Sequence, residues 1–313
     1  MVTNSETAAI PTSVVIVGSV AIDTVETPVG KQENVLGGAA VYSSVSASFF
    51  APVQLVGVVG EDFPSEHVEL LRARGIDLQG LQIAPGQTFR WSGYYDSDLN
   101  QAHSRATELN VFADFHPRLP ESYRDTPFVF LANIDPDLQL EVLEQVRHPR
   151  LVVCDTMNFW IDGKPERLRE VIRRADVVFM NDAEARQFCG TSSVLRAARH
   201  LLSLGPRAVV IKKGEHGALL FTRDGYFSAP SYLLEEVTDP TGAGDTFAGG
   251  FIGYLASSGD LSEPNLRKAT VYGSVMASFN IEDFSLNRMR RLTPGEIRAR
   301  YSQFKAISFF EAV

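Results

Sequence analysis

The sequence predicts an α/β fold: a three-layer α/β/α sandwich with a mainly parallel central sheet and a small inserted β-sheet. Short β-branched runs alternate with helical patterns along most of the 313 residues, which is typical of a parallel sheet covered by helices on both faces. Residues 218–221 and 226–228, separated by Thr-Arg-Asp-Gly, predict a late hairpin. Residues 24–34 and 88–110 have strand-like spacing without a crossover helix, so they predict the separate small sheet.

The predicted elements follow in chain order. Strands of the central sheet are short apolar runs at 13–17, 54–59, 128–131, 151–154, 177–180 and 208–212. Helical patterns cover 39–50, 65–74, 137–146, 165–174, 183–188 and 193–204, and then 246–257, 263–279 and 294–310. We therefore expect a loose tail over residues 1–12 and one domain over 13–313, with the strands of the small sheet inserted at about 23–34 and 86–112.

The charge and composition limit the possible partners. A formal net charge of -9 repels nucleic acid, so a bound phosphate must be held by local geometry. No apolar run approaches the roughly 20 residues that span a bilayer, so we expect no membrane partner. Cys154 and Cys189 do not have metal-ligand spacing, and they fit a reduced, cytoplasmic protein.

A glycine-rich turn precedes one predicted helix. Gly242, Ala243 and Gly244 stand where a helix begins, and free amide groups at a helix N-terminus form an anion cradle. Asp245 lies beside that cradle, where it either acts as general base for an attacking hydroxyl or caps the helix. Gly249 and Gly250 cost about 1 kcal/mol each relative to alanine inside a helix. They therefore predict a close backbone approach.

Other candidate residues follow predicted strands or precede helices. Asp23 comes after the first strand, where a carboxylate can accept hydrogen bonds from the hydroxyls of a polyol. Gly37 and Gly38 allow the backbone to close on a sugar. Asn181 and Glu184 lie one helical turn apart and can hold Mg²⁺ through its waters, although Asn181 could instead be only a helix cap.

Residues 239–251 have the sequence Asp-Pro-Thr-Gly-Ala-Gly-Asp-Thr-Phe-Ala-Gly-Gly-Phe. This segment resembles the C-terminal signature of the ribokinase-like (PfkB) carbohydrate kinase family. The resemblance extends over roughly residues 14–308 and implies a ribokinase-like fold whose small sheet is a lid. It implies that Asp245 is the catalytic base and that the amides of Gly242, Ala243 and Gly244 form the anion hole. It further implies that Asp23 and the Gly37-Gly38 segment bind the substrate.

The resemblance also suggests the remaining binding residues. For ATP it implies the loop with Gly214 and Gly217 and an adenine pocket near Asn280; in the same loop, Lys213 or Lys212 either touches phosphate or is only part of a charged turn at the strand end. It implies Mg²⁺ beside Asn181 and Glu184, and a monovalent cation such as K⁺ near Asp239. Candidates to cover the substrate are the lid residues Arg90, Trp91 and Tyr94, and Asp155 and Asn158 could line the pocket. The lid sheet is also a candidate surface for a homodimer.

One position departs from the family pattern. Tyr42 stands where the family usually has asparagine in its G-G-x-x-x-N segment. This change replaces an amide with a phenol that has a stacking face. It leaves phosphoryl transfer untouched, but it keeps a nucleoside or an inositol-type cyclitol open as acceptors beside a sugar.

We therefore predict an ATP-dependent, Mg²⁺-requiring kinase that phosphorylates a hydroxyl on a sugar or sugar-like polyol. A nucleoside or cyclitol kinase is the alternative within the family. A catalytically silent protein that binds a metabolite is an alternative from another class. The sequence contains neither the G-x-G-x-x-G of a dinucleotide-binding dehydrogenase after its first strand nor a Walker P-loop.

Overall fold

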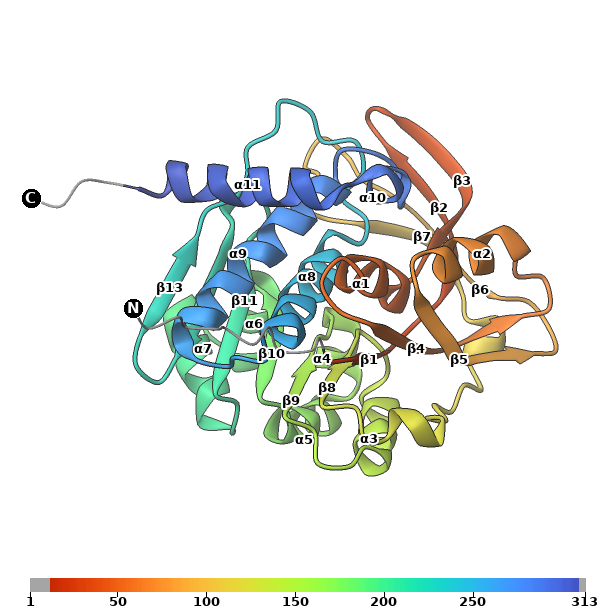
Figure 1. The fold of residues 1–313 in the computed structure, drawn as a ribbon, viewed down its shortest axis with the longest axis horizontal. Coiled ribbons are helices and arrows are strands. Elements are labelled where there is room, and N and C mark those ends of the chain that lie inside the picture. Colours follow the sequence, from red (N-terminus) through yellow and green to blue (C-terminus); the bar gives the residue numbers. More distant parts are fainter. Residues whose placement is uncertain (1–11, 310–313) are drawn as a thin grey trace, which may run out of the picture.

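The central sheet has nine strands in the order β13-β12-β11-β10-β9-β8-β1-β4-β5, in a computed structural model that describes residues 12–309 (Figure 1). They are β1 (Val14–Val17), β4 (Val53–Gly60), β5 (Ile76–Ala84), β8 (Phe128–Leu131), β9 (Leu151–Cys154), β10 (Val177–Asn181), β11 (Ala208–Lys212), β12 (Ala218–Thr222) and β13 (Tyr226–Ala229). The run from β11 to β5 is parallel, and β12 and β13 add an antiparallel hairpin at one edge. The predicted α/β sandwich is confirmed.

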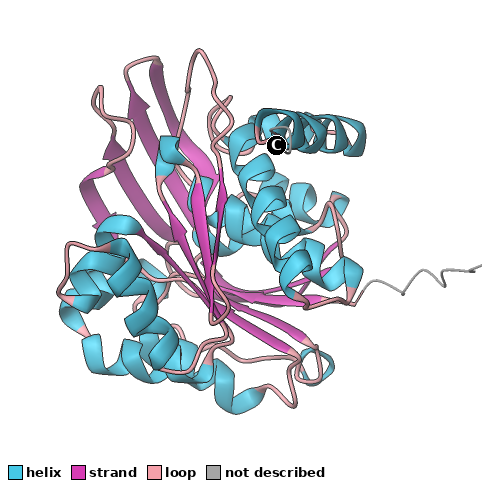
Figure 2. Ribbon diagram, turned by 90° about the vertical axis from the view of Figure 1, so that its left-hand side faces the viewer, coloured by secondary structure: helices cyan, strands magenta, loops and turns pink. Residues whose placement is uncertain are grey.

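Helices cover both faces of this sheet (Figure 2). Val14 and Ile16 face one core, and Val15 and Val17 face the other, because side chains of a strand alternate between its two faces. The first core contains α1 (Ala39–Ala47), α8 (Ala243–Ser258), α9 (Glu263–Asn280) and residues of α2 (Ser65–Ala73), α10 (Asn287–Arg291) and α11 (Pro294–Ile307). The second contains residues of α3 (Pro136–Gln145), α4 (Asn158–Gly163), α5 (Pro165–Arg174), α6 (Asp182–Cys189) and α7 (Val194–Ser203).

The strand order reverses beside β1. The chain first adds β4 and β5 on one side of β1, and then β8 to β11 on the other side. In open parallel sheets, ligands bind outside the carboxyl ends of the strands at such a reversal. The topology therefore places the site above β1 and β8.

A second sheet of four strands has the order β3-β2-β6-β7. Its strands are β2 (Ala21–Thr27), β3 (Gly30–Gly37), β6 (Phe89–Tyr94) and β7 (His103–Glu108), and β2 pairs with β6 in parallel. The separate small sheet is thus present. Its first two strands lie within residues 21–37, a slightly longer segment than the predicted 23–34. Half of the residues of β3 and most of those of β7 are exposed.

One β-strand and two α-helices of the described residues were not predicted. Edge strand β5 was missed because its sequence has no continuous apolar run. Only Ile76 and Gly80 of its residues are buried. The short helices α4 and α10 contain six and five residues, too few for a clear helical period. The predicted tail over residues 1–12 lies outside the described residues except for Thr12, whose hydroxyl donates to the Ala256 carbonyl at 3.0 Å. Between residues 12 and 309, no helix is long and apolar enough to cross a membrane.

Candidate active site

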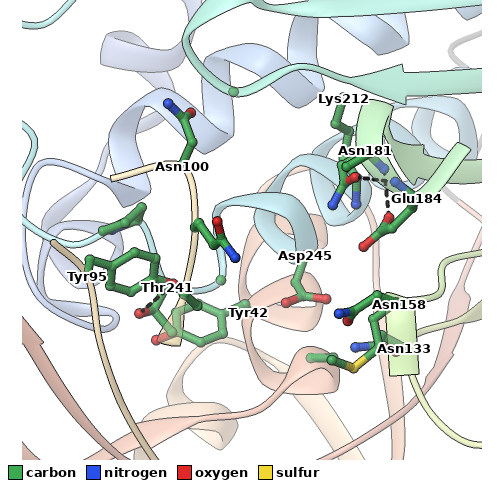
Figure 3. Close-up of a pocket in the computed structure, with 18 of the residues that line it drawn as sticks. Tyr42, Tyr95, Asn100, Asn133, Asn158, Asn181, Glu184, Lys212, Thr241 and Asp245 are labelled. Atoms are coloured by element: carbon green, nitrogen blue, oxygen red, sulfur yellow. Dashed lines mark hydrogen bonds between the residues drawn. The ribbon is translucent and has the colours of Figure 1, made fainter. Parts of the chain in front are cut away.

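Two adjoining cavities lie at the carboxyl ends of the central strands. The larger, of about 900 Å³, opens beneath the small sheet, and the smaller, of about 560 Å³, lies between the loop after β11 and helix α9. Both are lined by Asn181, Glu184 and Lys212, so these side chains stand where the cavities meet. Figure 3 shows the larger cavity, with Asp245 between the tyrosine side and the side that holds Asn133 and Asn158.

Helix α8 begins at this junction. Gly242 precedes its first residue with a left-handed φ of 73°, and a Cβ at this position would lie 2.4 Å from the ring of Tyr42. Only glycine therefore allows the turn to pack against the tyrosine ring. The Ala243 amide donates to the Pro240 carbonyl at 3.1 Å, which closes the turn. The Gly242 and Gly244 amides have no acceptor among residues 12–309, so two of the three predicted amides are free to bind an anion.

Asp245 lies in the first turn of α8 and lines the larger cavity. Burial raises the pKa of Asp245 to about 7, and the charge of Asp155 adds to this while Lys212 opposes it. A carboxylate with a pKa near neutrality, close to free amides, is suited to accept a proton from a hydroxyl group. Gly242 occupies the N-cap position of α8, so Asp245 is the third residue of the helix rather than its cap.

The close backbone approach predicted from Gly249 and Gly250 is present. A Cβ on Gly249 would lie 2.2 Å from the Ser43 carbonyl oxygen of α1, and one on Gly250 would lie 2.8 Å from Met276 of α9. The neighbours are helices rather than a ligand. These contacts hold the start of α8 against α1, which carries Tyr42.

Asp23 stands on β2 and forms part of one wall of the larger cavity. Its side chain is 4% exposed, and a Cβ on Gly37 would lie 1.8 Å from its carboxylate oxygen. Burial, helped by the charges of Asp239 and Asp245, raises the pKa of Asp23 to about 8. Gly37 therefore makes room for the carboxylate, while Gly38, with a φ of 98°, lines the cavity itself.

Two tyrosines connect this wall to the glycine turn. The Tyr42 hydroxyl is buried and has no hydrogen-bond partner among the described residues. Tyr95 follows strand β6, and its hydroxyl accepts a hydrogen bond from the Thr241 hydroxyl at 3.3 Å (Figure 3). This contact joins the small sheet to the loop before α8.

Asn181 and Glu184 form a capping box at the start of α6. The Asn181 side-chain oxygen accepts the Glu184 amide at 2.8 Å, and a Glu184 carboxylate oxygen accepts the Asn181 amide at 2.7 Å. Burial raises the pKa of Glu184 to about 7. The capping contact uses the side-chain oxygen of Asn181, so the NH₂ group of Asn181 is left for a ligand. The other carboxylate oxygen of Glu184 is left for a cation.

Several predicted residues line neither cavity: Gly37, Arg90, Tyr94, Asp239 and Asn280. Arg90 pairs with Asp62 at 2.8 Å and donates to Asn34, while Tyr94 stacks on His103. Their neighbours Phe89, Trp91 and Tyr95 line the larger cavity instead, because alternate residues of a strand face opposite sides. Asn280 is fully buried; it donates to the Thr241 carbonyl and accepts from the Thr246 hydroxyl, so it supports the glycine turn rather than an adenine pocket.

Asp239 is also fully buried. Its two carboxylate oxygens accept the amides of Thr241 and Ser285 at 2.9 and 3.0 Å, and burial raises its pKa. No group of three acidic, histidine or cysteine side chains within residues 12–309 is arranged to hold a metal. Asp239 thus orders two loops, and its contacts do not require a cation.

The loop after β11 divides between the cavities. Lys213 and Gly214 line the larger cavity, and Gly214 and Gly217 line the smaller one together with Ser274, Ala277 and Ser278 of α9. Lys212 lines both and pairs with Asp155 at 2.6 Å. Asn133 was missed by the sequence analysis, although it follows β8; its side-chain oxygen is buried without a partner among the described residues.

Comparison with known proteins identifies the family. The model of the pfkB family carbohydrate kinases matches residues 11–289. A cytidine kinase of Thermococcus kodakarensis is 35% identical over 256 residues, which cover 80% of this chain and 90% of the relative. A nucleoside kinase of Methanothermobacter thermautotrophicus is 28% identical over 263 residues, covering 82% of each chain.

A solved structure supports the fold. The nucleoside kinase of Burkholderia thailandensis in complex with ADP-inosine has a TM-score of 0.77 at 21% identity, and the match covers 94% of this chain and 96% of that one. The ribokinase-like fold is therefore confirmed by structure as well as by sequence. This chain belongs to the pfkB family of carbohydrate kinases, phosphotransferases whose acceptor is a hydroxyl group.

Proposed function

We propose that this chain is an ATP-dependent nucleoside kinase that phosphorylates a hydroxyl on the sugar part of its substrate. The observation that carries the proposal is the composition of the larger cavity. The cavity is lined by the carboxylates of Asp23 and Asp245 and by three aromatic residues, Phe89, Trp91 and Tyr95, which we call the aromatic cover. Carboxylates suit sugar hydroxyls, and aromatic rings stack on bases.

Phe89 stacks on Phe112, whereas the rings of Trp91 and Tyr95 stack on no other aromatic ring among residues 12–309. The Trp91 indole nitrogen donates to the Ser104 hydroxyl at 3.0 Å, so its polar atom is satisfied within the small sheet. The rings of Trp91 and Tyr95 are therefore available to a planar base, which a free monosaccharide lacks. The relatives named as cytidine and nucleoside kinases support the same acceptor class.

The proposed reaction uses Asp245 as general base. The acceptor hydroxyl gives its proton to the Asp245 carboxylate while its oxygen bonds to the γ-phosphorus of ATP, and the bond to the β-phosphate oxygen breaks to release ADP. The free amides of Gly242 and Gly244 donate to the phosphoryl oxygens, which carry the developing charge. Asp23 and the side chains of Asn133 and Asn158 hold the remaining hydroxyls.

The smaller cavity takes the nucleotide. It lies between Gly217 and the α9 residues Ser274, Ala277 and Ser278, and it reaches Gly244 at the start of α8. Glu184 fits Mg²⁺, because Mg²⁺ commonly takes one or two protein carboxylates together with phosphates and water. When bound, Mg²⁺ neutralises phosphate charge. The proposed reaction does not use K⁺, since the Asp239 carboxylate already accepts two backbone amides.

The small sheet acts as a lid in this proposal, within one kinase domain over residues 13–313. A lid keeps water from competing with the acceptor hydroxyl for the phosphoryl group. Its exposed edge strands β3 and β7 are the surface through which a homodimer would form. We assign the enzyme to the cytoplasm, where ATP is available. The set of base, free amides and Glu184 favours a working kinase over a silent binding protein.

The acceptor is tested by a coupled ADP-release assay. Purified protein with ATP and Mg²⁺ is given cytidine, uridine, adenosine, inosine, ribose, fructose and myo-inositol. We expect kcat/KM for the best nucleoside to exceed that for ribose by at least about 100-fold, since the base adds binding energy that the free sugar lacks. A preference for ribose, fructose or myo-inositol over every nucleoside would contradict the proposal.

A further inference from the structure

Lys212 ends strand β11 at the point where the two cavities meet. It is paired in the sheet with Asn181, the last residue of β10, and Asp155 directly follows the neighbouring strand β9. Three adjacent parallel strands therefore bring these polar side chains to one edge of the sheet. Lys212 lines both cavities, whereas Lys213 lines only the larger one. A phosphoryl group that moves from one cavity to the other passes the Lys212 side chain.

The ammonium group is held by a buried partner. Lys212 Nζ lies 2.6 Å from Asp155 Oδ2, and the two side chains are 18% and 3% exposed. Burial alone would lower the pKa of Lys212, but the charges of Asp155 and Glu184 outweigh it and raise the pKa. Lys212 therefore remains a cation. Asp155 lines neither cavity, so it is placed to orient the lysine rather than to touch a ligand.

The same ammonium lies against the glycine turn. A Cβ on Gly244 would stand 3.1 Å from Lys212 Nζ. Lys212 Nζ thus lies beside Gly244, whose amide, like that of Gly242, has no acceptor among residues 12–309. This arrangement provides a positive charge and two amide donors for an anion.

A buried ion pair usually contributes little net stability to a fold. The cost of removing both charges from water often exceeds their attraction, and an apolar pair of similar size serves a core as well. A binding role for the ammonium explains why the lysine is placed here.

We propose that Lys212 is a catalytic residue that contacts the transferring phosphoryl group, and that Asp155 is the positioning residue that holds it there. The proposal rests on the kinase reaction given above. As the acceptor oxygen bonds to phosphorus and ADP leaves, Lys212 donates a charge-assisted hydrogen bond to a phosphoryl oxygen and keeps all its protons. Asp245 alone takes the hydroxyl proton.

The first test compares Lys212→Gln with Lys268→Gln, a matched change of an exposed lysine on α9. Calorimetry measures the affinity for ADP and for ADP with aluminium fluoride, a mimic of the phosphoryl group in transfer. We expect Lys212→Gln to weaken binding of the mimic by on the order of 100-fold, as loss of one oxyanion donor does, with ADP affinity within a few fold. Equal binding of the mimic by both variants and the wild type would overturn the proposal.

This measurement requires no acceptor. If the protein phosphorylated no nucleoside, the proposed acceptor would be wrong. The expected effect of Lys212→Gln on binding of the mimic would not change. The two failures are therefore distinguishable.

A second test separates catalysis from folding. Lys212→Gln and Asp155→Asn each leave a buried partner without its opposite charge, so both should lower Tm, and the double variant should recover part of the loss. We expect kcat of Asp155→Asn to fall while its KM for ATP stays within a few fold, and the double variant to regain Tm but not kcat. Recovery of kcat along with Tm would mean that the pair is structural.

Discussion

Asp245 illustrates what burial does to a single residue at this site. In water its carboxyl group would be ionised at neutral pH and would be a weak base. Burial at the start of α8 and the nearby charge of Asp155 raise its pKa to about 7, which matches the group to proton transfer near neutral pH. The residue type sets the chemistry, and the environment sets the strength of the base.

We predict that Asp245→Asn lowers kcat by about 10²- to 10⁴-fold, because an amide cannot accept the hydroxyl proton. The affinity for ATP should stay within a few fold, since the free amides of the turn remain. Turnover by coupled assay and ATP binding by calorimetry check both parts. Asp224→Asn, on the exposed hairpin turn, is the matched control and should be fully active. An Asp245→Asn enzyme within tenfold of wild type would contradict the assignment.

Helices α1 and α8 act together as the elements that place the glycine turn. Gly249 and Gly253 of α8 lie against the backbone of Ser43 and Ala47 in α1. The Ser46 hydroxyl donates to the Thr246 carbonyl at 2.7 Å across the same contact. This packing explains why helix α8 tolerates glycines that lower its intrinsic stability. It also sets the distance between Tyr42 and Gly242.

We predict that Gly249→Ala lowers the free energy of unfolding by about 1–3 kcal/mol, because the added methyl group would lie 2.2 Å from the Ser43 carbonyl oxygen. Gly295→Ala is the matched control, since this exposed helical glycine has its nearest neighbour at 3.9 Å. That variant should be neutral or more stable by up to about 1 kcal/mol. Urea unfolding measures both. Equal stabilities for the two variants would show that α1 and α8 are not closely packed.

At the scale of the whole molecule, the site is built from two sheets. The central sheet contributes the strand-end residues, and the small sheet contributes Asp23 and the aromatic cover. Burying Asp23, Glu184 and Asp245 between them raises all three pKa values. A carboxyl group whose pKa is raised on folding binds its proton more tightly in the folded state. Stability therefore falls as the pH rises from the unfolded to the folded pKa.

We predict this pH dependence for Asp23, whose pKa is raised from 3.8 to about 8. Between these pH values the wild type loses up to about 1.4 kcal/mol of unfolding free energy per pH unit through this one group. Asp23→Asn lacks the loss, so it should match the wild type most closely near pH 4 and become the more stable protein by pH 9. Urea unfolding without ligands at several pH values measures the difference. Parallel curves for Asp23→Asn and wild type would contradict the prediction.

Much of the architecture could be predicted from the sequence, because the evidence for it is local. Strand runs and helical periods gave the order of the central elements, and the stretch from Asp239 to Phe251 gave the turn and Asp245. Glu184 was found in the same way, one helical turn after a strand end. Edge strand β5 was not predicted, because an edge strand buries few side chains and so has no clear apolar pattern.

The tertiary structure decided which neighbouring side chain enters the site. Lys212 rather than Lys213 reaches both cavities, and Phe89 and Trp91 rather than Arg90 line the larger one. Adjacent residues of a strand point to opposite faces, so a sequence locates the strand more easily than the face that meets the ligand. Asp155 and Lys212 are 57 residues apart in sequence, and only the pairing of β9, β10 and β11 joins them. The sequence by itself determined the family and singled out Asp245 as the candidate base; the packing of two sheets determined which side chains line the larger cavity.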